Sequence, residues 1–67
     1  MNRNMFIRQL PIEKQDAIKK ELISFYETAF HGDYDKQEVS NMIEEIMNDR
    51  IWVLEEGFSY LLDELNI

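Results

Sequence analysis

The sequence predicts an all-α fold: an antiparallel hairpin of two helices with an N-terminal arm packed against them. Three observations lead to this prediction. Apolar residues recur every three or four positions through residues 36–65, Pro11 and Gly32 mark a helix start and a helix end, and a short polar segment, 31–34, separates the two helical patterns. We expect the 67 residues to form one small helical domain, 1–67.

The arm, residues 1–10, contains too many apolar side chains to stay in water, so we expect part of it to pack. It is expected to form a short strand, a helical turn or an extended segment that lies across the helices. Pro11 suits the first position of a helix, where its missing N–H costs nothing. The first helix is predicted over about residues 11–30, and Gly32 is predicted to end it in a left-handed conformation. The predicted core residues of this helix are Ile18, Leu22 and Phe25.

The second helix is predicted to be long, over about residues 36–65. Asp35 is placed to accept hydrogen bonds from its first turn, and Glu38 follows three residues later, as in a capping box. The polar residues on the opposite face of this helix keep the same helical spacing through Asn48, which favours one unbroken helix. Gly57 costs this helix about 1 kcal/mol relative to Ala. The predicted core residues of the long helix are Ile43, Met47, Leu54, Phe58, Leu61 and Leu65.

A two-helix hairpin leaves apolar surface exposed on both helices, and a chain this short is marginal on its own. We therefore expect a homodimer in which two hairpins form a four-helix bundle. The alternative is a monomeric three-helix bundle in which the long helix breaks near residues 48–50, because Asn and Asp are weak helix formers.

The formal net charge of −7 is unevenly distributed. Residues 1–20 carry five basic and two acidic side chains, a balance of +3, whereas residues 21–67 carry two basic and twelve acidic ones, a balance of −10. This acidic excess argues against direct nucleic-acid binding through the long helix. There is no Cys, no apolar run long enough for a membrane span and no signal-peptide pattern, so we expect a cytoplasmic protein without membrane contact.

No pattern indicates an enzyme, a cofactor or a metal site. The residues entering the second helix resemble an EF-hand loop in spacing, but Glu38 stands where such a loop needs Gly, so helix capping and a solvated acidic face are preferred. His31 has no second His or Cys to support it, and it suits the end of a helix. The oxygen-bearing residues compared with a calcium loop are Asp33, Asp35, Gln37, Asn41 and Glu44.

Trp52 falls on the polar face of the predicted long helix, and a large aromatic in a polar rim is typical of a binding hot spot. Two structural readings compete: the arm folds over Trp52, or a helix break turns it inward. Arg50 is predicted to point into the apolar stripe. The predicted partner-binding residues are Trp52, Glu45, Asn48, Asp49, Glu56 and Ser59, and Tyr26, Tyr34 and Tyr60 either border an interface or pack at the edge of the core.

The leading functional hypothesis is a small homodimeric, non-catalytic module that binds an unidentified protein through an acidic helical face centred on Trp52. The alternative is a nucleic-acid mimic, an inhibitor or regulator of the kind found in phage and mobile elements, whose carboxylates occupy a basic DNA- or RNA-binding groove. A third hypothesis is a regulator that touches DNA through its basic residues near the N-terminus. These residues are Arg3, Arg8, Lys14, Lys19 and Lys20.

Overall fold

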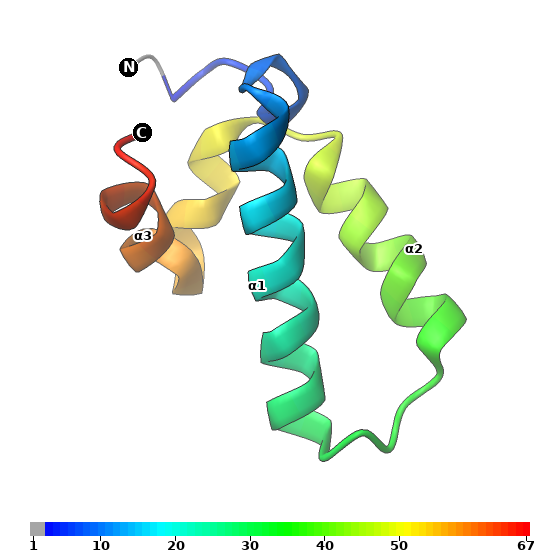
Figure 1. Cartoon of the computed structure of the whole chain (residues 1–67). Helices are drawn as coiled ribbons and strands as arrows, with labels where there is room; N and C mark the ends of the chain where they lie inside the picture. Colours follow the sequence, from blue (N-terminus) through cyan, green and yellow to red (C-terminus); the bar gives the residue numbers. More distant parts are fainter. Residues whose placement is uncertain (1–2) are drawn as a thin grey trace.

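The computed structural model describes residues 3–67, and they are all-helical, which confirms the predicted fold class. Helix α1 runs through the middle of the molecule, with α2 on one side and α3 on the other (Figure 1). Residues 3–10 and the C-terminal residues lie toward the end of the molecule opposite the loop between α1 and α2 (Figure 1). The elements are η1 (Ile7–Gln9), α1 (Ile12–Phe30), α2 (Lys36–Met47), η2 (Ile51–Leu54) and α3 (Glu55–Glu64), where η denotes a 3₁₀-helix.

The prediction of one long helix over residues 36–65 is wrong. Helix α2 ends at Met47, and Arg50 has extended backbone angles, φ −79° and ψ 154°, before η2 begins at Ile51. The chain is therefore a three-helix arrangement broken near residues 48–50, which is the alternative that the sequence left open.

The N-terminal arm explains the break. Phe6 and Arg50 form an antiparallel bridge, and the Ile51 N–H donates to the Met5 carbonyl at 2.8 Å. The first N–H groups of any helix lack partners within that helix, and here carbonyls of the arm supply them at the start of η2. Backbone pairing between segments so distant in sequence leaves no trace in apolar periodicity, so the pattern could not reveal it.

Burial nevertheless continues with helical spacing across the break, because Met47, Ile51 and Leu54 are all buried. A helical spacing of buried residues therefore does not require that the backbone between them is helical. The prediction for Arg50 is also wrong: Arg50 is exposed, and Ile51 takes the buried place. The Arg50 guanidinium lies 4.5 Å from the centre of the Phe6 ring and donates to the Asn4 carbonyl.

A second irregularity lies inside α3, where residues 56–58 have non-helical backbone angles. Gly57 has φ 89°, a left-handed value that other residues adopt at a cost. No atom lies within 4 Å of the place a Cβ would occupy there. Gly57 therefore allows the kink in α3. It is not part of a regular helix, and no neighbouring helix packs closely against it.

Both ends of the loop between α1 and α2 follow local sequence signals. Helix α1 ends at Phe30, as predicted. The left-handed conformation predicted for Gly32 begins one residue earlier, at His31 (φ 53°), and Gly32 also has a positive φ of 77°. The predicted cap at Asp35 is confirmed, since its side chain accepts hydrogen bonds from the first-turn N–H groups of α2 at 2.9 and 3.3 Å.

The core lies where the arm, α1, α2, η2 and α3 meet. Phe25, predicted as core, is 48% exposed, because it lies toward the end of α1 beyond most of this packing. Phe58 and Leu65 are partly buried. Elements η2 and α3 fold back beside α1 and cover part of the surface that a bare hairpin would expose (Figure 1). The buried apolar residues are Ile7, Leu10, Ile18, Leu22, Val39, Ile43, Met47, Ile51, Leu54, Leu61 and Leu62.

Candidate interaction surfaces

Trp52 stands on η2 with its side chain 46% exposed. Its backbone N–H donates to the Arg3 carbonyl at 3.0 Å, and the Arg3 guanidinium pairs with Glu55 at 2.9 Å. The arm therefore holds the backbone of Trp52 while about half of the side chain remains open to solvent. The helix break places the neighbouring Ile51 and Leu54 in the core instead of the tryptophan.

The break divides the other predicted partner-binding residues between two elements. Glu45 belongs to α2, and Asn48 and Asp49 follow its end, whereas Glu56 and Ser59 lie in the kinked α3. All five are exposed. They do not form the single helical face that the sequence predicted, because the backbone changes direction between the two groups.

One part of the predicted surface is brought together in a groove between α2 and η2, which we call the acidic groove. Its volume is about 290 Å³, and it is lined by Met42, Glu45, Ile46, Asp49 and Val53. Met42 is 43% exposed, while the other two apolar residues are partly buried. The Asp49 carboxylate accepts a hydrogen bond from the Arg50 N–H at 2.7 Å, which helps to hold it at the rim.

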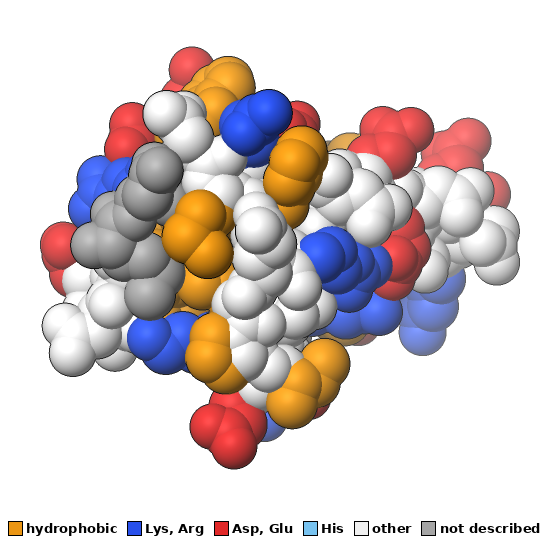
Figure 2. All heavy atoms as spheres, turned by 90° about the horizontal axis from the view of Figure 1, so that it is seen from above, with side chains coloured by type: hydrophobic (Ala, Val, Ile, Leu, Met, Phe, Trp, Pro, Cys, Tyr) orange, Lys and Arg blue, Asp and Glu red, His pale blue; other side chains and the backbone are white. Residues whose placement is uncertain are grey.

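Most carboxylates of the chain lack a basic partner. Of the fourteen Asp and Glu residues, Glu44 and Glu55 alone form ion pairs with Lys or Arg within residues 3–67, which leaves twelve. At the end of the molecule opposite the loop between α1 and α2, apolar side chains lie in separate groups among charged ones (Figure 2). The acidic groove thus belongs to a surface with a large uncompensated negative charge.

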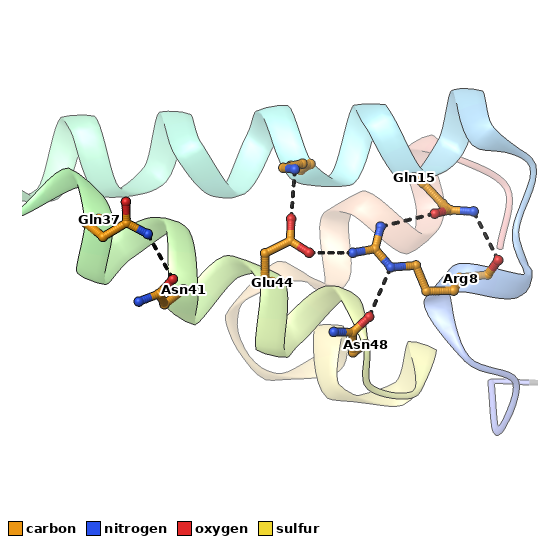
Figure 3. A network of polar contacts seen from close by, with 7 residues as sticks. Arg8, Gln15, Gln37, Asn41, Glu44 and Asn48 are labelled. Atoms are coloured by element: carbon orange, nitrogen blue, oxygen red, sulfur yellow. Dashed lines mark hydrogen bonds and ion pairs between the residues drawn. The ribbon is translucent and has the colours of Figure 1, made fainter.

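The basic residues of the arm are used within the fold. Arg8 extends from the arm to α2, where it donates to Glu44 at 2.6 Å and to Asn48 at 3.1 Å (Figure 3). Glu44 also accepts a hydrogen bond from Lys19 at 2.9 Å, and this bond and charge, with a smaller effect of Arg8, hold the pKa of Glu44 below its ordinary value. Since Arg3 and Arg8 are both paired with carboxylates, the arm presents less free charge to DNA than its sequence indicated.

A second surface is a chain of neighbouring aromatic rings, which we call the aromatic row. Phe25 contacts Phe58 edge to face with ring centres 5.2 Å apart, and Tyr26 stacks on Phe30 with ring centres 6.0 Å apart. Phe25 and Phe30 are each 48% exposed, and Tyr60 is 43% exposed. The members of the row are Phe25, Tyr26, Phe30, Tyr34, Phe58 and Tyr60.

Carboxylates border the aromatic row. The Tyr34 hydroxyl donates to Glu27 at 3.0 Å, and the Tyr60 hydroxyl donates to Glu21 at 3.3 Å. Desolvation, together with these carboxylates, raises the pKa of both tyrosine hydroxyls above the ordinary value. The sequence indicated the tyrosines but not the row. The available signal was the spacing of Tyr26 and Phe30, four residues apart on one predicted helix, whereas Tyr34 lies in the loop and Phe58 in α3.

A third surface is a hollow of about 280 Å³ between α1 and α2 near their loop. Its apolar residues are Ile23, Val39 and Ile43, and its rim mixes both charges. Lys19 is already paired with Glu44, so this hollow has no uniform charge to select a ligand. The remaining lining residues are Glu27, Tyr34, Lys36 and Ser40.

The described part of the chain contains no group of three or more His, Cys, Asp or Glu side chains arranged to hold a metal ion. In residues 3–67, no helix combines the length and apolar character that crossing a membrane requires. No protein-family model, curated protein or solved structure matches this chain. The function is therefore argued from the surfaces described above.

Proposed function

We propose that this chain is a small, non-catalytic interaction module that binds a basic, amphipathic segment of another protein in the acidic groove. The observation that carries the proposal is the groove itself, in which Met42, Ile46 and Val53 offer apolar contact between Glu45 and Asp49. Neither carboxylate has a Lys or Arg partner within residues 3–67. A segment that inserts an apolar side chain and flanks it with Lys or Arg complements this arrangement.

The two parts of the groove have different tasks. Burial of apolar side chains supplies most of the affinity, whereas complementary charge selects the partner and speeds association. Trp52 is about half exposed and directly precedes Val53, which lines the groove, and tryptophan is a residue type that often carries much of the binding energy of an interface. The groove volume of about 290 Å³ suits a few apolar side chains and not a large ligand.

The test is a titration with a synthetic helical peptide that has Leu on one face and Lys along its flanks. We expect saturable binding by the natural chain and at least a tenfold loss with Trp52→Ala, because truncation of a hot-spot residue costs about 2 kcal/mol or more. The double variant Glu45→Gln with Asp49→Asn is also expected to weaken binding. The matched control, Glu13→Gln with Asp16→Asn, removes two exposed carboxylates from α1 and is expected to bind almost as tightly.

Three outcomes decide against the groove. They are no binding of the Leu–Lys peptide, equal losses in the groove and control variants, and tight binding of a peptide in which Glu replaces Lys. Thermal melting of each variant separates lost binding from lost folding. In particular, unfolding of Trp52→Ala would assign the tryptophan to the core.

The twelve carboxylates without a Lys or Arg partner favour a second candidate function, that of a nucleic-acid mimic occupying a basic DNA- or RNA-binding groove. Such binding rests on many exposed charges, so it should weaken steeply as salt rises. Binding in the acidic groove keeps an apolar part that salt does not screen. Weak salt dependence together with a large Trp52→Ala effect selects the groove over mimicry.

We propose that the module acts without a fixed dimer. The expectation of a four-helix bundle rested on an open hairpin, and η2 with α3 supplies the missing cover in one chain. Sedimentation of the chain alone tests this: a monomer supports it, and a concentration-independent dimer restores the original prediction.

A further inference from the structure

The exposed faces of the aromatic row need an explanation that the acidic groove does not give. Phe25 and Phe30 are each about half exposed, and they lie on the part of α1 that extends toward the loop, away from residues 3–10 (Figure 1). Single exposed apolar residues are ordinary, but Phe25, Phe30 and Tyr60 are exposed members of one continuous chain of rings, and such a patch marks an interaction surface.

Carboxylates lie beside the row, and Lys36 lies near one end of it, in the hollow that Tyr34 and Glu27 also line. Glu27 and Glu21 each accept a hydrogen bond from a tyrosine of the row, and Glu64 is close enough to Tyr60 to help raise its pKa. None of these three carboxylates forms an ion pair with Lys or Arg in the described part of the chain. Ring faces attract cations, and carboxylates attract them further, so both parts of this surface prefer the same kind of ligand.

Within this fold one arginine already binds a ring face. The Arg50 guanidinium lies 4.5 Å from the centre of the Phe6 ring while it also donates to a backbone carbonyl. A planar guanidinium stacks on a ring and still donates in its own plane, whereas a Lys ammonium is a compact, strongly hydrated charge. The aromatic row repeats the ring face and adds carboxylates as acceptors.

We propose that the aromatic row binds an arginine-rich segment of a partner protein, with guanidinium groups on the exposed faces of Phe25 and Phe30 and hydrogen bonds to Glu27 and Glu21. A second copy of this chain fits less well, because two copies would bring the same carboxylates together and each copy carries a net charge of −7. The row shares no residue with the acidic groove, so each of the two proposed binding sites can be tested without the other.

The test compares an oligoarginine peptide with an oligolysine peptide of equal length. Because a guanidinium stacks on a ring and is less strongly hydrated than an ammonium, we expect oligoarginine to bind more tightly than oligolysine. Removal of one ring should lower the oligoarginine affinity about two- to fivefold, the worth of one exposed cation–π contact. Phe30→Leu keeps an apolar side chain but removes the ring, so it should lower the oligoarginine affinity and bring the two peptides closer together. If Phe30→Leu fails to fold, Phe25→Leu tests the same prediction.

Two controls locate the effect. The groove variant, Glu45→Gln with Asp49→Asn, should leave the ratio of oligoarginine to oligolysine affinity unchanged. Ile12→Leu, which alters an exposed apolar residue outside the row, should change neither affinity.

The proposal is overturned by equal affinities for the two peptides, by an arginine preference that survives in both ring variants, or by a preference that only the groove variant removes. It is also overturned if sedimentation finds a dimer that Phe30→Leu dissociates, since the occupant is then a second copy.

Discussion

The backbone N–H of Ile7 donates a 3.0 Å hydrogen bond to the carbonyl of Asp49. The bond joins the N-terminal arm to the turn that follows α2, and the Ile7 side chain is completely buried. An otherwise unpaired carbonyl beyond a helix end thus gains a partner, and the same residue fills the core beneath it. The arm is therefore attached to the turn at Asp49, which also lines the acidic groove.

Shortening the buried arm residue should destabilise the fold. Ile7→Val is predicted to lower the free energy of unfolding by about 1 kcal/mol, because one methyl group leaves a packed site. Ile12→Val, the same chemical change at a side chain that is 64% exposed, should change it by less than about 0.5 kcal/mol. Urea denaturation measures both values, and equal losses would mean that the arm is not packed.

The buried side chain of Gln15 should require its amide. Its nitrogen donates to the Leu10 carbonyl at 2.7 Å and to the Arg8 carbonyl at 3.1 Å, so Gln15→Glu removes both bonds and is predicted to cost about 1–3 kcal/mol. Gln9→Glu is the control, since the Gln9 oxygen only accepts a hydrogen bond from the Phe6 N–H and a carboxylate can do the same. Chemical denaturation that ranks these two variants in the opposite order would contradict the bonding described.

The kink in α3 should depend on glycine. Gly57→Ala is predicted to cost about 1 kcal/mol or more, because φ is 89° and no neighbour is close enough to add a clash. His31→Gly is the reverse change at φ 53°, and it is predicted to stabilise the chain by about 0.5–1 kcal/mol. Melting curves test both signs, and stabilisation by Gly57→Ala would show that α3 prefers to be straight.

The ion pairs at Glu44 should make stability depend on pH in the acid range. The pKa of Glu44 is lowered from an ordinary value of 4.5, so the unfolded chain binds its proton first as the pH falls. The stabilisation is complete above about pH 4.5 and is lost as the pH falls through the lower, folded pKa. Between about pH 7 and pH 3, the natural chain should therefore lose more stability than Glu44→Gln. An identical loss in both proteins would mean that the pairs contribute nothing.

The sequence was sufficient where local rules determine the structure. Pro11 and the apolar spacing located α1, and Asp35 located the start of α2, because a helix cap acts within one turn. Among the predicted core residues, Ile18, Leu22 and Ile43 are buried as their positions on helical stripes indicated.

The rest depended on distant contacts. The break after Met47 is maintained by hydrogen bonds from the arm, and Ile51 replaces Arg50 in the core without disturbing the helical spacing of buried residues. Periodicity records which residues are buried, not whether the backbone between them stays helical. For the same reason the predicted surface around Trp52 was only partly assembled: Glu45 and Asp49 share a groove, whereas Glu56 and Ser59 lie in the kinked α3.

The measurement that tests the central claim most directly is an NMR titration of the labelled chain with the Leu–Lys peptide, following each backbone amide. Binding in the acidic groove predicts saturable shifts at Met42, Glu45, Asp49 and Val53, accompanied by the Trp52 indole N–H, and little change in the middle of α1. Shifts that are absent from these residues, or that spread evenly over all exposed carboxylates, would contradict the account.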